Sequence, residues 1–273
     1  MTEFEQQEIP FAERRFRSRR FRRGIYLLPS MFTVGNLLCG YYAIVASFIG
    51  SPELFDHAAK AIGIAIVFDS LDGRVARLTG TTSEFGVQFD SLADVVSFGV
   101  APALLAYSWG VRSLAGQETL GVQQLGQLAW ICCLLFLVCC AWRLARFNVQ
   151  GMAPGGSKYF VGMPTPAAAG VIAALVHGFK VPLHNESWAT AWLLLTAVLG
   201  ALMTSTIRFY SFKDLPWTRR QPSLAVVVLV LFLAVVWKYS EIVLTLCATG
   251  YAASAVVLHV VRLLRHRLVS RTA

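Results

Sequence analysis

Four aspartates lie close together in a chain that is otherwise poor in charged residues. They fall in the stretch FDSLDGRVARLTGTTSEFGVQFDSLAD, which ends at Asp94. Asp69 and Asp72 are three residues apart, and Asp90 and Asp94 are four apart, so in two helices each pair occupies one helix face. Acidic side chains in apolar helices are costly and usually mark a functional site.

The spacing also predicts how the two pairs meet. The turn TGTTSE, residues 79–84, separates the two helices that carry them. Asp69 and Asp94 lie about 13 Å along their helices from this turn, and Asp72 and Asp90 are closer to it. If the helices pack as a hairpin, we expect all four carboxylates to face one cavity.

Four carboxylates in one cavity repel each other unless protons or cations intervene. Oxygen ligands suit hard cations such as Mg²⁺ or Mn²⁺, and two divalent ions would balance the four charges. Paired ions of this kind commonly act on phosphate groups. The pattern therefore predicts two divalent cations and a substrate with phosphate oxygens.

Small and basic residues accompany the aspartates. Gly73, Ala76 and Gly86 lie on or near the same faces and would let a bulky ligand approach the helix backbones. Arg77 is suitably placed for a diphosphate. The alternative is that the carboxylates only pair with Arg74 and Arg77. Two arginines cannot neutralise four aspartates, and an unpaired buried charge is expensive.

The composition predicts the fold class that holds these residues. The chain is 56% hydrophobic and 14% charged, with a mean hydropathy of +0.59, which favours a polytopic membrane protein. Long unbroken apolar runs favour an all-α helix bundle over a barrel. About eight transmembrane spans are predicted: Leu27–Gly50, Ala58–Leu78, Phe85–Trp109, Leu125–Phe147, Thr165–Phe179, Trp188–Ile207, Leu224–Trp237 and Ile242–Leu264.

Charged residues flank this membrane domain, residues 27–264, and predict its orientation. A basic segment, residues 1–26, precedes it as a tether to the membrane surface, and a basic tail, residues 265–273, follows it. Of the 24 Lys and Arg residues, 20 fall on the side of the predicted membrane domain where the N-terminus lies. Because cytoplasmic loops carry the excess of positive charge, both termini and the aspartates are predicted to lie on the cytoplasmic side of a bacterial-type cytoplasmic membrane. This sidedness and contact with anionic lipid explain the basic pI near 9.5 without nucleic acid.

The aspartate stretch resembles the signature of the CDP-alcohol phosphotransferase family, D-x2-D-G-x2-A-R-x8-G-x3-D-x3-D. This chain has its eight fixed positions at Asp69, Asp72, Gly73, Ala76, Arg77, Gly86, Asp90 and Asp94. The resemblance implies a core of six membrane helices, here with two more, and two divalent metals, Mg²⁺ or Mn²⁺. It also implies transfer of a substituted phosphate from a CDP-linked lipid to an alcohol, with release of CMP.

The resemblance also implies roles for single residues. The metal ligands would be the aspartates Asp69, Asp72 and Asp90, joined by Asp94, which would also be the general base. Gly73, Ala76, Arg77 and Gly86 would bind CDP-diacylglycerol, together with Ser83 in the turn and Thr33 and Asn36 in PSMFTVGN. Hydroxyl and amide groups near a membrane interface can also simply cap a helix, and for the last three residues this alternative stays open.

Residues outside the signature resemble the branch of the family that uses serine as the acceptor, phosphatidylserine synthase. The matching stretches are WRLARFN, FVGMPTPAAAG and IRFYSFKD, at Trp142–Asn148, Phe160–Gly170 and Ile207–Asp214. The carboxylate of serine needs cations, and the candidates are Arg143, Arg146, Arg208 and Lys213, with Asn148 for the ammonium or carboxylate. Each basic residue could instead reach a lipid phosphate.

The expected partners are CDP-diacylglycerol, L-serine and membrane lipids, and a homodimer stays open. Within the family the acceptor could instead be glycerol 3-phosphate, an inositol phosphate or choline. From another class, a cation transporter would also carry intramembrane aspartates. Transporters place these near the bilayer midplane on repeat-related helices, whereas here they cluster toward one side without a visible repeat.

Overall fold

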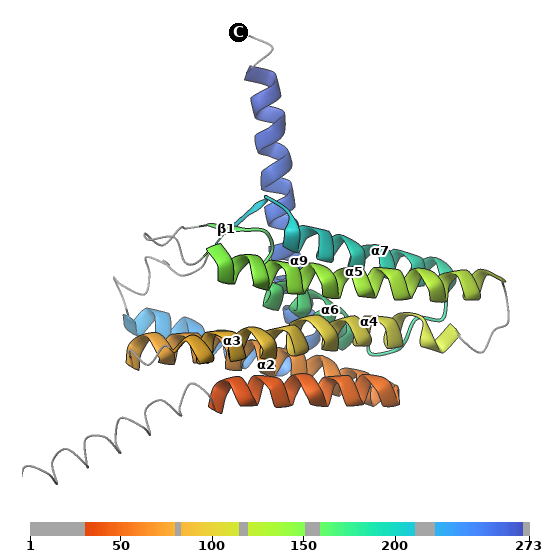
Figure 1. The fold of residues 1–273 in the computed structure, drawn as a ribbon, viewed down its shortest axis with the longest axis horizontal. Coiled ribbons are helices and arrows are strands. Elements are labelled where there is room, and N and C mark those ends of the chain that lie inside the picture. Colours follow the sequence, from red (N-terminus) through yellow and green to blue (C-terminus); the bar gives the residue numbers. More distant parts are fainter. Residues whose placement is uncertain (1–30, 80–82, 115–119, 151–158, 211–221, 270–273) are drawn as a thin grey trace, which may run out of the picture.

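The computed structural model describes residues 31–79, 83–114, 120–150, 159–210 and 222–269. In this part of the chain most helices run side by side along the long axis of the molecule (Figure 1). They are the first helix Met31–Ile49, α2 Pro52–Thr79, α3 Glu84–Asp94, α4 Ala101–Gly110, α5 Leu120–Gln150, α6 Thr165–Phe179, α7 Glu186–Thr204 and α9 Pro222–Val269. A π-helical turn, η1 Val95–Val100, joins α3 to α4, and a short 3₁₀ turn, η2 Arg112–Leu114, follows α4. The predicted helical fold class is confirmed.

Several of these helices have the length and apolar character of membrane spans. Among the described residues four stretches are long and apolar enough to cross a membrane: Met31–Ile49, Glu84–Gly110, Gln123–Val149 and Glu186–Thr204. α6 has the bounds predicted for the fifth span but only 15 residues. α2 is not among the four because charged residues lie toward both of its ends: Glu53, Asp56 and Lys60 near the start and Asp69, Asp72, Arg74 and Arg77 near the finish. The protein is a polytopic helical membrane protein.

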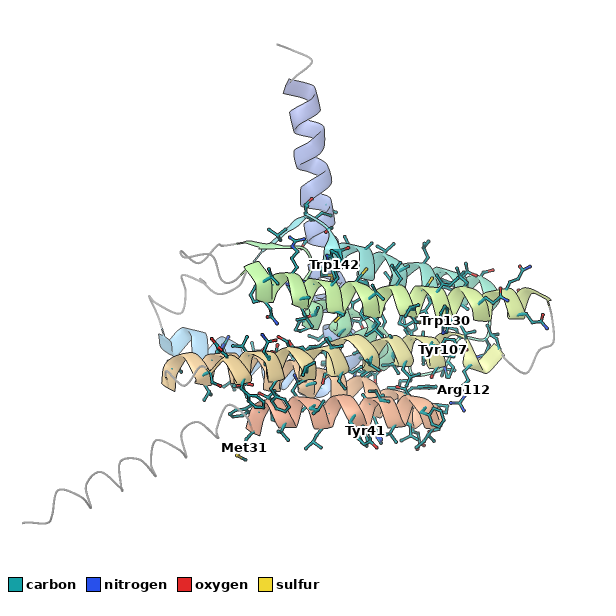
Figure 2. The ribbon with its side chains drawn as sticks, viewed as in Figure 1. Met31, Tyr41, Tyr107, Arg112, Trp130 and Trp142 are labelled. Carbon is teal, nitrogen blue, oxygen red and sulfur yellow. The ribbon has the colours of Figure 1, made fainter. Side chains whose placement is uncertain are left out.

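The outer surface of the bundle fits contact with lipid. Met31 and Arg112 lie toward opposite ends of the bundle in Figure 2, and Tyr41, Trp130 and Trp142 lie between them. These three aromatic side chains are exposed, as are many Leu, Ile and Val residues along the same helices. Apolar side chains facing outward along helices of this length are what a lipid environment requires.

The predicted division of the C-terminal region into two helices is confirmed. α9 consists of two helices that meet at a kink at Tyr239 (φ −127°, ψ 40°), which lies between the predicted spans Leu224–Trp237 and Ile242–Leu264. The two residues after the kink have partners at the end of α6: Ser240 contacts His177, and Glu241 pairs with Lys180. In Figure 1 the C-terminal part of α9 rises steeply away from the direction of the other helices.

A short β-ribbon is the feature that the all-α prediction missed. β1, Tyr159–Val161, pairs antiparallel with β2, Arg208–Tyr210, which follows α7. The backbone continues the pairing where the N–H of Gly162 donates to the carbonyl of Ile207 over 2.8 Å. Gly162 has φ +78°, and a Cβ there would collide with the carbonyl oxygen of Met203. The ribbon therefore brings together two of the stretches that resemble the serine branch.

The core is built around α6 and the contact between α5 and α7. α6 is rich in small residues and buried on nearly every side, for example at Ala168, Ala169 and Ile172. Gly200 of α7 lies against the backbone of Phe136 on α5, where a Cβ would be 3.0 Å from its Cα. Small residues at membrane helix contacts allow the backbones to approach closely. Gly200 therefore allows the backbones of α5 and α7 to pack closely at this point.

Candidate active site

Three of the four aspartates converge. Asp69 on α2 and Asp90 and Asp94 on α3 each place a carboxylate oxygen so that all three lie within 4.8 Å of one another. Asp94 is buried, with 8% of its surface exposed, and the other two are partly buried. The two helices therefore meet as the hairpin that the spacing predicted, with their acidic faces toward each other.

Asp72 departs from the predicted arrangement. It is not in the group of three, and its Oδ2 accepts a hydrogen bond from the hydroxyl of Thr33 on the first helix. Three residues along an α-helix turn a side chain about 60° away from its starting direction, which directs Asp72 toward that helix. The carboxylate is buried, at 6% exposed. The expected set of four facing one cavity is thus three converging carboxylates with a fourth beside them.

The first helix also contacts the general-base candidate. Asn36 is fully buried, and its Nδ2 donates to Oδ1 of Asp94 over 3.0 Å. Thr33 and Asn36, expected to contact the nucleotide, therefore both hydrogen-bond to carboxylates of the signature. They lie three residues apart on one face of the first helix, which explains why both reach the aspartates.

Several buried polar atoms around Asp94 have no partner. Within the described part of the chain these are Oδ1 of Asn36, Oδ1 of Asp90 and Nε of Arg143. A buried polar atom without a hydrogen bond costs about 1–3 kcal/mol, so such atoms seldom gather unless a ligand satisfies them. Three converging carboxylates with an unpaired oxygen form a donor set that fits a hard divalent cation.

The start of α3 agrees with the capping alternative for Ser83. This residue is the N-cap of α3, and its hydroxyl accepts a hydrogen bond from the N–H of Gly86 over 3.0 Å. A Cβ at Gly86 would lie 3.1 Å from that hydroxyl. Ser83 and Gly86 therefore form the cap from which the helix leads to Asp90 and Asp94.

The remaining signature residues lie on α2. Gly73 is exposed directly after Asp72, and Ala76 is partly buried one turn later. Arg77 belongs to the same helix, and its side chain lies outside what the structure describes.

Of the candidate acceptor residues, three lie on α5 within the described part of the chain, and the side chains of the other two lie outside it. Arg143 and Arg146 are partly buried on α5, and the charge of Arg143 is close enough to act on Asp94. Asn148, also on α5, donates from Nδ2 to the hydroxyl of Ser91 on α3 over 2.9 Å. Arg208 takes part in β2 through its backbone, its side chain is not described, and Lys213 lies outside the described residues.

Sequence reasoning missed two serines that belong to this site. Ser91 receives the hydrogen bond from Asn148, and Ser97 in η1 donates to the backbone carbonyl of Asn36 over 2.9 Å. Both follow an aspartate of the signature by one or three residues. A polar side chain in an apolar stretch so close to the signature was the available signal.

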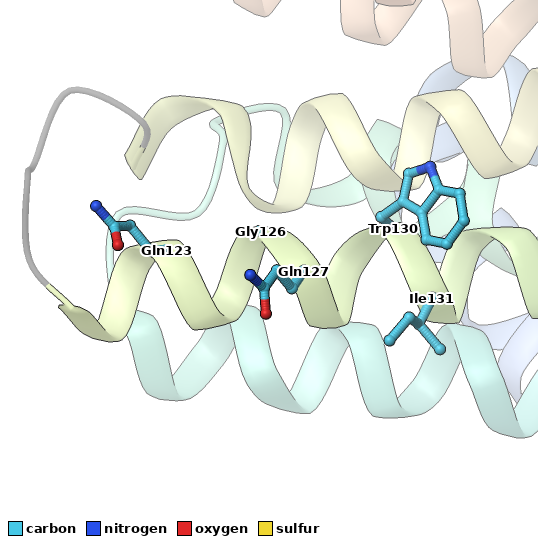
Figure 3. A pocket seen from close by; sticks show the side chains of 5 residues that line it. All are labelled: Gln123, Gly126, Gln127, Trp130 and Ile131. Carbon is cyan, nitrogen blue, oxygen red and sulfur yellow. The ribbon is translucent and has the colours of Figure 1, made fainter.

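A hollow elsewhere on α5 is not part of the site. Its lining lies within the first half of the helix, about 18 to 30 Å from Arg143 at 1.5 Å per residue (Figure 3). It is lined by Gln123, Gly126, Gln127, Trp130 and Ile131.

Comparisons with known proteins agree with the signature. The model of the family described as CDP-alcohol phosphatidyltransferase matches residues 26–203. The chain is 37% identical over 194 residues to the CDP-diacylglycerol–serine O-phosphatidyltransferase of Helicobacter pylori, covering 71% of this chain and 76% of that protein. It is 34% identical over 192 residues to the enzyme of the same name from Methanocaldococcus jannaschii, covering 70% and 78%. The protein of that name from Saccharomyces cerevisiae is 37% identical over 160 residues, covering 55% and 53%.

Proposed function

The chain belongs to the CDP-alcohol phosphatidyltransferase family, and we propose that it transfers the phosphatidyl group of CDP-diacylglycerol to the hydroxyl of L-serine, releasing CMP. The observation that carries the chemistry is the convergence of Asp69, Asp90 and Asp94 in a helical membrane protein. The choice of serine is supported by relatives from bacteria, an archaeon and a yeast that share this name.

The aspartates would hold two divalent cations, Mg²⁺ or Mn²⁺. Asp69, Asp90 and Asp94 provide the converging oxygens, and Asp72 provides a fourth carboxylate beside them. When bound, such ions stabilise negative charge on phosphate oxygens and on a phosphate leaving group. Thr33 holds Asp72 by its hydrogen bond, so the first helix helps to shape the donor set.

The reaction would take place beside Asp94. The serine hydroxyl oxygen forms a bond to the phosphorus that carries diacylglycerol, and the bond from that phosphorus to the CMP oxygen breaks. The hydroxyl proton passes to the carboxylate of Asp94, whose Oδ1 is held by Asn36. CMP leaves with the electron pair of the broken bond.

The substrates would approach from two sides. The diacylglycerol chains remain in lipid, while Gly73, Ala76 and Gly86 leave room for the diphosphate along α2 and α3. Arg77 follows Gly73 by one turn and would bind the diphosphate. The carboxylate of serine would bind Arg143, whose guanidinium lies near Asp94 and has a buried nitrogen without a partner in the described chain.

The aspartate end of the bundle would face the cytoplasm, with both termini. This orientation is supported by the 20 of 24 Lys and Arg residues on the side of the N-terminus. It would give the site access to soluble serine and allow CMP to leave into the same compartment.

The test is to incubate the purified protein with CDP-diacylglycerol, Mg²⁺ or Mn²⁺, and labelled serine. Wild type should form a labelled phospholipid and CMP in equal amounts, and a chelator should abolish both. CMP release with glycerol 3-phosphate, an inositol phosphate or choline, but not with serine, would keep the chemistry and reassign the acceptor. No CMP with any of these alcohols would contradict the proposed function.

A further inference from the structure

The π-helical turn η1 begins directly after Asp94. In a π turn the backbone hydrogen bonds join residues five apart instead of four, so it changes which side chains face a neighbouring helix, and such turns are frequent at functional sites. Its buried residues include Ser97, which faces the first helix. At Gly40 on the first helix, a Cβ would lie 2.8 Å from the Cα of Ser97. Only glycine permits this close approach of the two backbones.

Two hydrogen bonds connect η1 and Asp94 to the same residue. The hydroxyl of Ser97 donates to the backbone carbonyl of Asn36 over 2.9 Å. The side-chain amide of Asn36 donates to Oδ1 of Asp94 over 3.0 Å. Asn36 is thus held at its backbone by the residue three positions after Asp94 and holds the carboxylate of Asp94 with its side chain. All three residues are buried.

The amide suits this task better than a charged donor. A carboxylate only accepts hydrogen bonds, so the Nδ2 of Asn36 must face Asp94, and the orientation of the amide follows. A neutral donor fixes the carboxylate without cancelling its charge, whereas an Arg or Lys would compete for it as an ion pair. Asp94 thereby keeps its capacity to take a proton or contact a cation.

We propose that Asn36 is a positioning residue for Asp94, and that Ser97 in the π turn supports it. This inference rests on the proposed function, in which Asp94 takes the serine proton, and it gives Asn36 a role other than a nucleotide contact. The hydrogen bond sets the direction of the carboxylate toward the acceptor hydroxyl. Misplacing a catalytic group by about 1 Å can lower the reaction rate about 100-fold.

The experiment compares Asn36→Leu, Ser97→Ala and the control Ser47→Ala. Leu has the same branched arrangement of side-chain heavy atoms as Asn but cannot donate a hydrogen bond. Ser47 is a buried serine on the same first helix whose hydroxyl donates to the carbonyl of Ala43 over 2.7 Å. We expect Asn36→Leu to lower kcat about 10- to 100-fold and Ser97→Ala about 3- to 10-fold. Ser47→Ala should leave kcat unchanged.

Binding measurements separate positioning from the other possible roles. If Asn36 positions Asp94, the KM and the directly measured Kd for CDP-diacylglycerol should change less than about 3-fold in Asn36→Leu. A rise of about 10-fold or more in that Kd with kcat intact would overturn the inference in favour of a nucleotide contact. A lowered melting temperature with a proportional loss of CDP-diacylglycerol binding would overturn it in favour of a purely structural role.

A structure of Asn36→Leu makes the test independent of the acceptor. We expect the Asp94 side chain to leave its wild-type rotamer in that variant and to keep it in Ser47→Ala. An unchanged Asp94 in Asn36→Leu would overturn the inference even if wild type is active. Wild type that makes no phosphatidylserine would contradict the proposed function, while the position of Asp94 still decides the inference.

Discussion

Two polar clusters at different depths of the same bundle differ in how many of their buried polar atoms have hydrogen-bond partners. The aspartate cluster is Asp69, Asp90 and Asp94 with the neighbouring Asp72. The second, here called the Asp56 cluster, consists of Asp56 and Lys60 on α2, His177 on α6 and Ser240 on α9. α2 contributes to both, and its residues Asp56 and Asp69 are about 20 Å apart along the helix.

In the Asp56 cluster the carboxylate has partners for both oxygens. Oδ2 of Asp56 accepts a hydrogen bond from Lys60 over 2.7 Å, and Oδ1 is hydrogen-bonded to Nδ1 of His177. The other ring nitrogen of His177, a residue only 5% exposed, lies 2.8 Å from the hydroxyl of Ser240. Ser240 follows the kink at Tyr239, so this chain of contacts joins α2 and α6 to the bend in α9.

The difference indicates what each cluster is for. Among the described residues, none of the Asp56 cluster's side-chain atoms is buried without a partner, whereas Asp90, Asn36 and Arg143 at the other cluster each have one. A satisfied network contributes to the fold, because removing one member leaves the others unpaired. An unsatisfied group of like charges costs stability, and proteins retain such costs where a ligand or a reaction needs them.

The difference between the two clusters is tested most directly by neutralising one aspartate in each. Asp94→Asn should lower kcat by about 10²- to 10⁴-fold, because the acceptor hydroxyl loses its base, while the protein remains folded. Asp56→Asn should keep kcat within a few-fold. CMP release at saturating serine measures both. Similar activity losses in the two variants would mean that the clusters do not differ in the way described.

Binding of Mn²⁺ should stabilise the protein through the aspartate cluster alone. At 100 times the dissociation constant, a ligand that binds only the folded state adds about 2.7 kcal/mol. The rise in melting temperature on adding Mn²⁺ should disappear in Asp90→Asn and persist in Asp56→Asn. Without metal, Asp90→Asn should melt no lower than wild type, since it relieves repulsion between carboxylates. An unaltered Mn²⁺ effect in Asp90→Asn would place the metal elsewhere.

Removing the histidine of the Asp56 cluster should cost stability. His177→Leu leaves Ser240 and one oxygen of Asp56 without their partner, and we expect a loss of about 1–3 kcal/mol in the free energy of unfolding. Chemical denaturation in detergent measures it, and the KM for CDP-diacylglycerol should stay near the wild-type value. A variant as stable as wild type would show that the network is not needed to hold α9.

The Asp56 cluster should also make stability depend on pH in the acid range. Burial alone would raise the pKa of Asp56, but hydrogen bonds from Lys60 and His177 bring it below its ordinary value. A lowered pKa in the folded state means that the contribution to stability is complete above the ordinary pKa, near 4, and is lost as pH falls through the lowered one. Asp56→Asn should remove that part of the acid sensitivity, which melting curves between about pH 6 and pH 3 would reveal.

The smallest effect is expected at the exposed ion pair beside this cluster. The ammonium of Lys180 contacts the carboxylate of Glu241, and both side chains are open to solvent. Exposed ion pairs are screened and contribute little. Lys180→Gln should therefore leave both activity and melting temperature unchanged within error. A clear loss would show that this pair, and not His177, holds the kink.

The sequence alone was enough to predict an acidic site and the helices that hold it. The helical spacing of the two aspartate pairs and the turn between them predicted that all four carboxylates meet, and three of them, Asp69, Asp90 and Asp94, do so. Apolar runs likewise predicted most helices, including the bounds of α6, because lipid requires long apolar helices.

Other features depended on contacts between residues far apart in the chain. Only the tertiary structure decided that Asp72 turns to Thr33, that Asn36 faces Asp94, and that Ser240 beside the kink of α9 meets His177. The β-ribbon and the π turn after Asp94 belong with these. The physical reason is that a polar group's partner is whichever group packing brings within about 3 Å, and local sequence does not contain that distance.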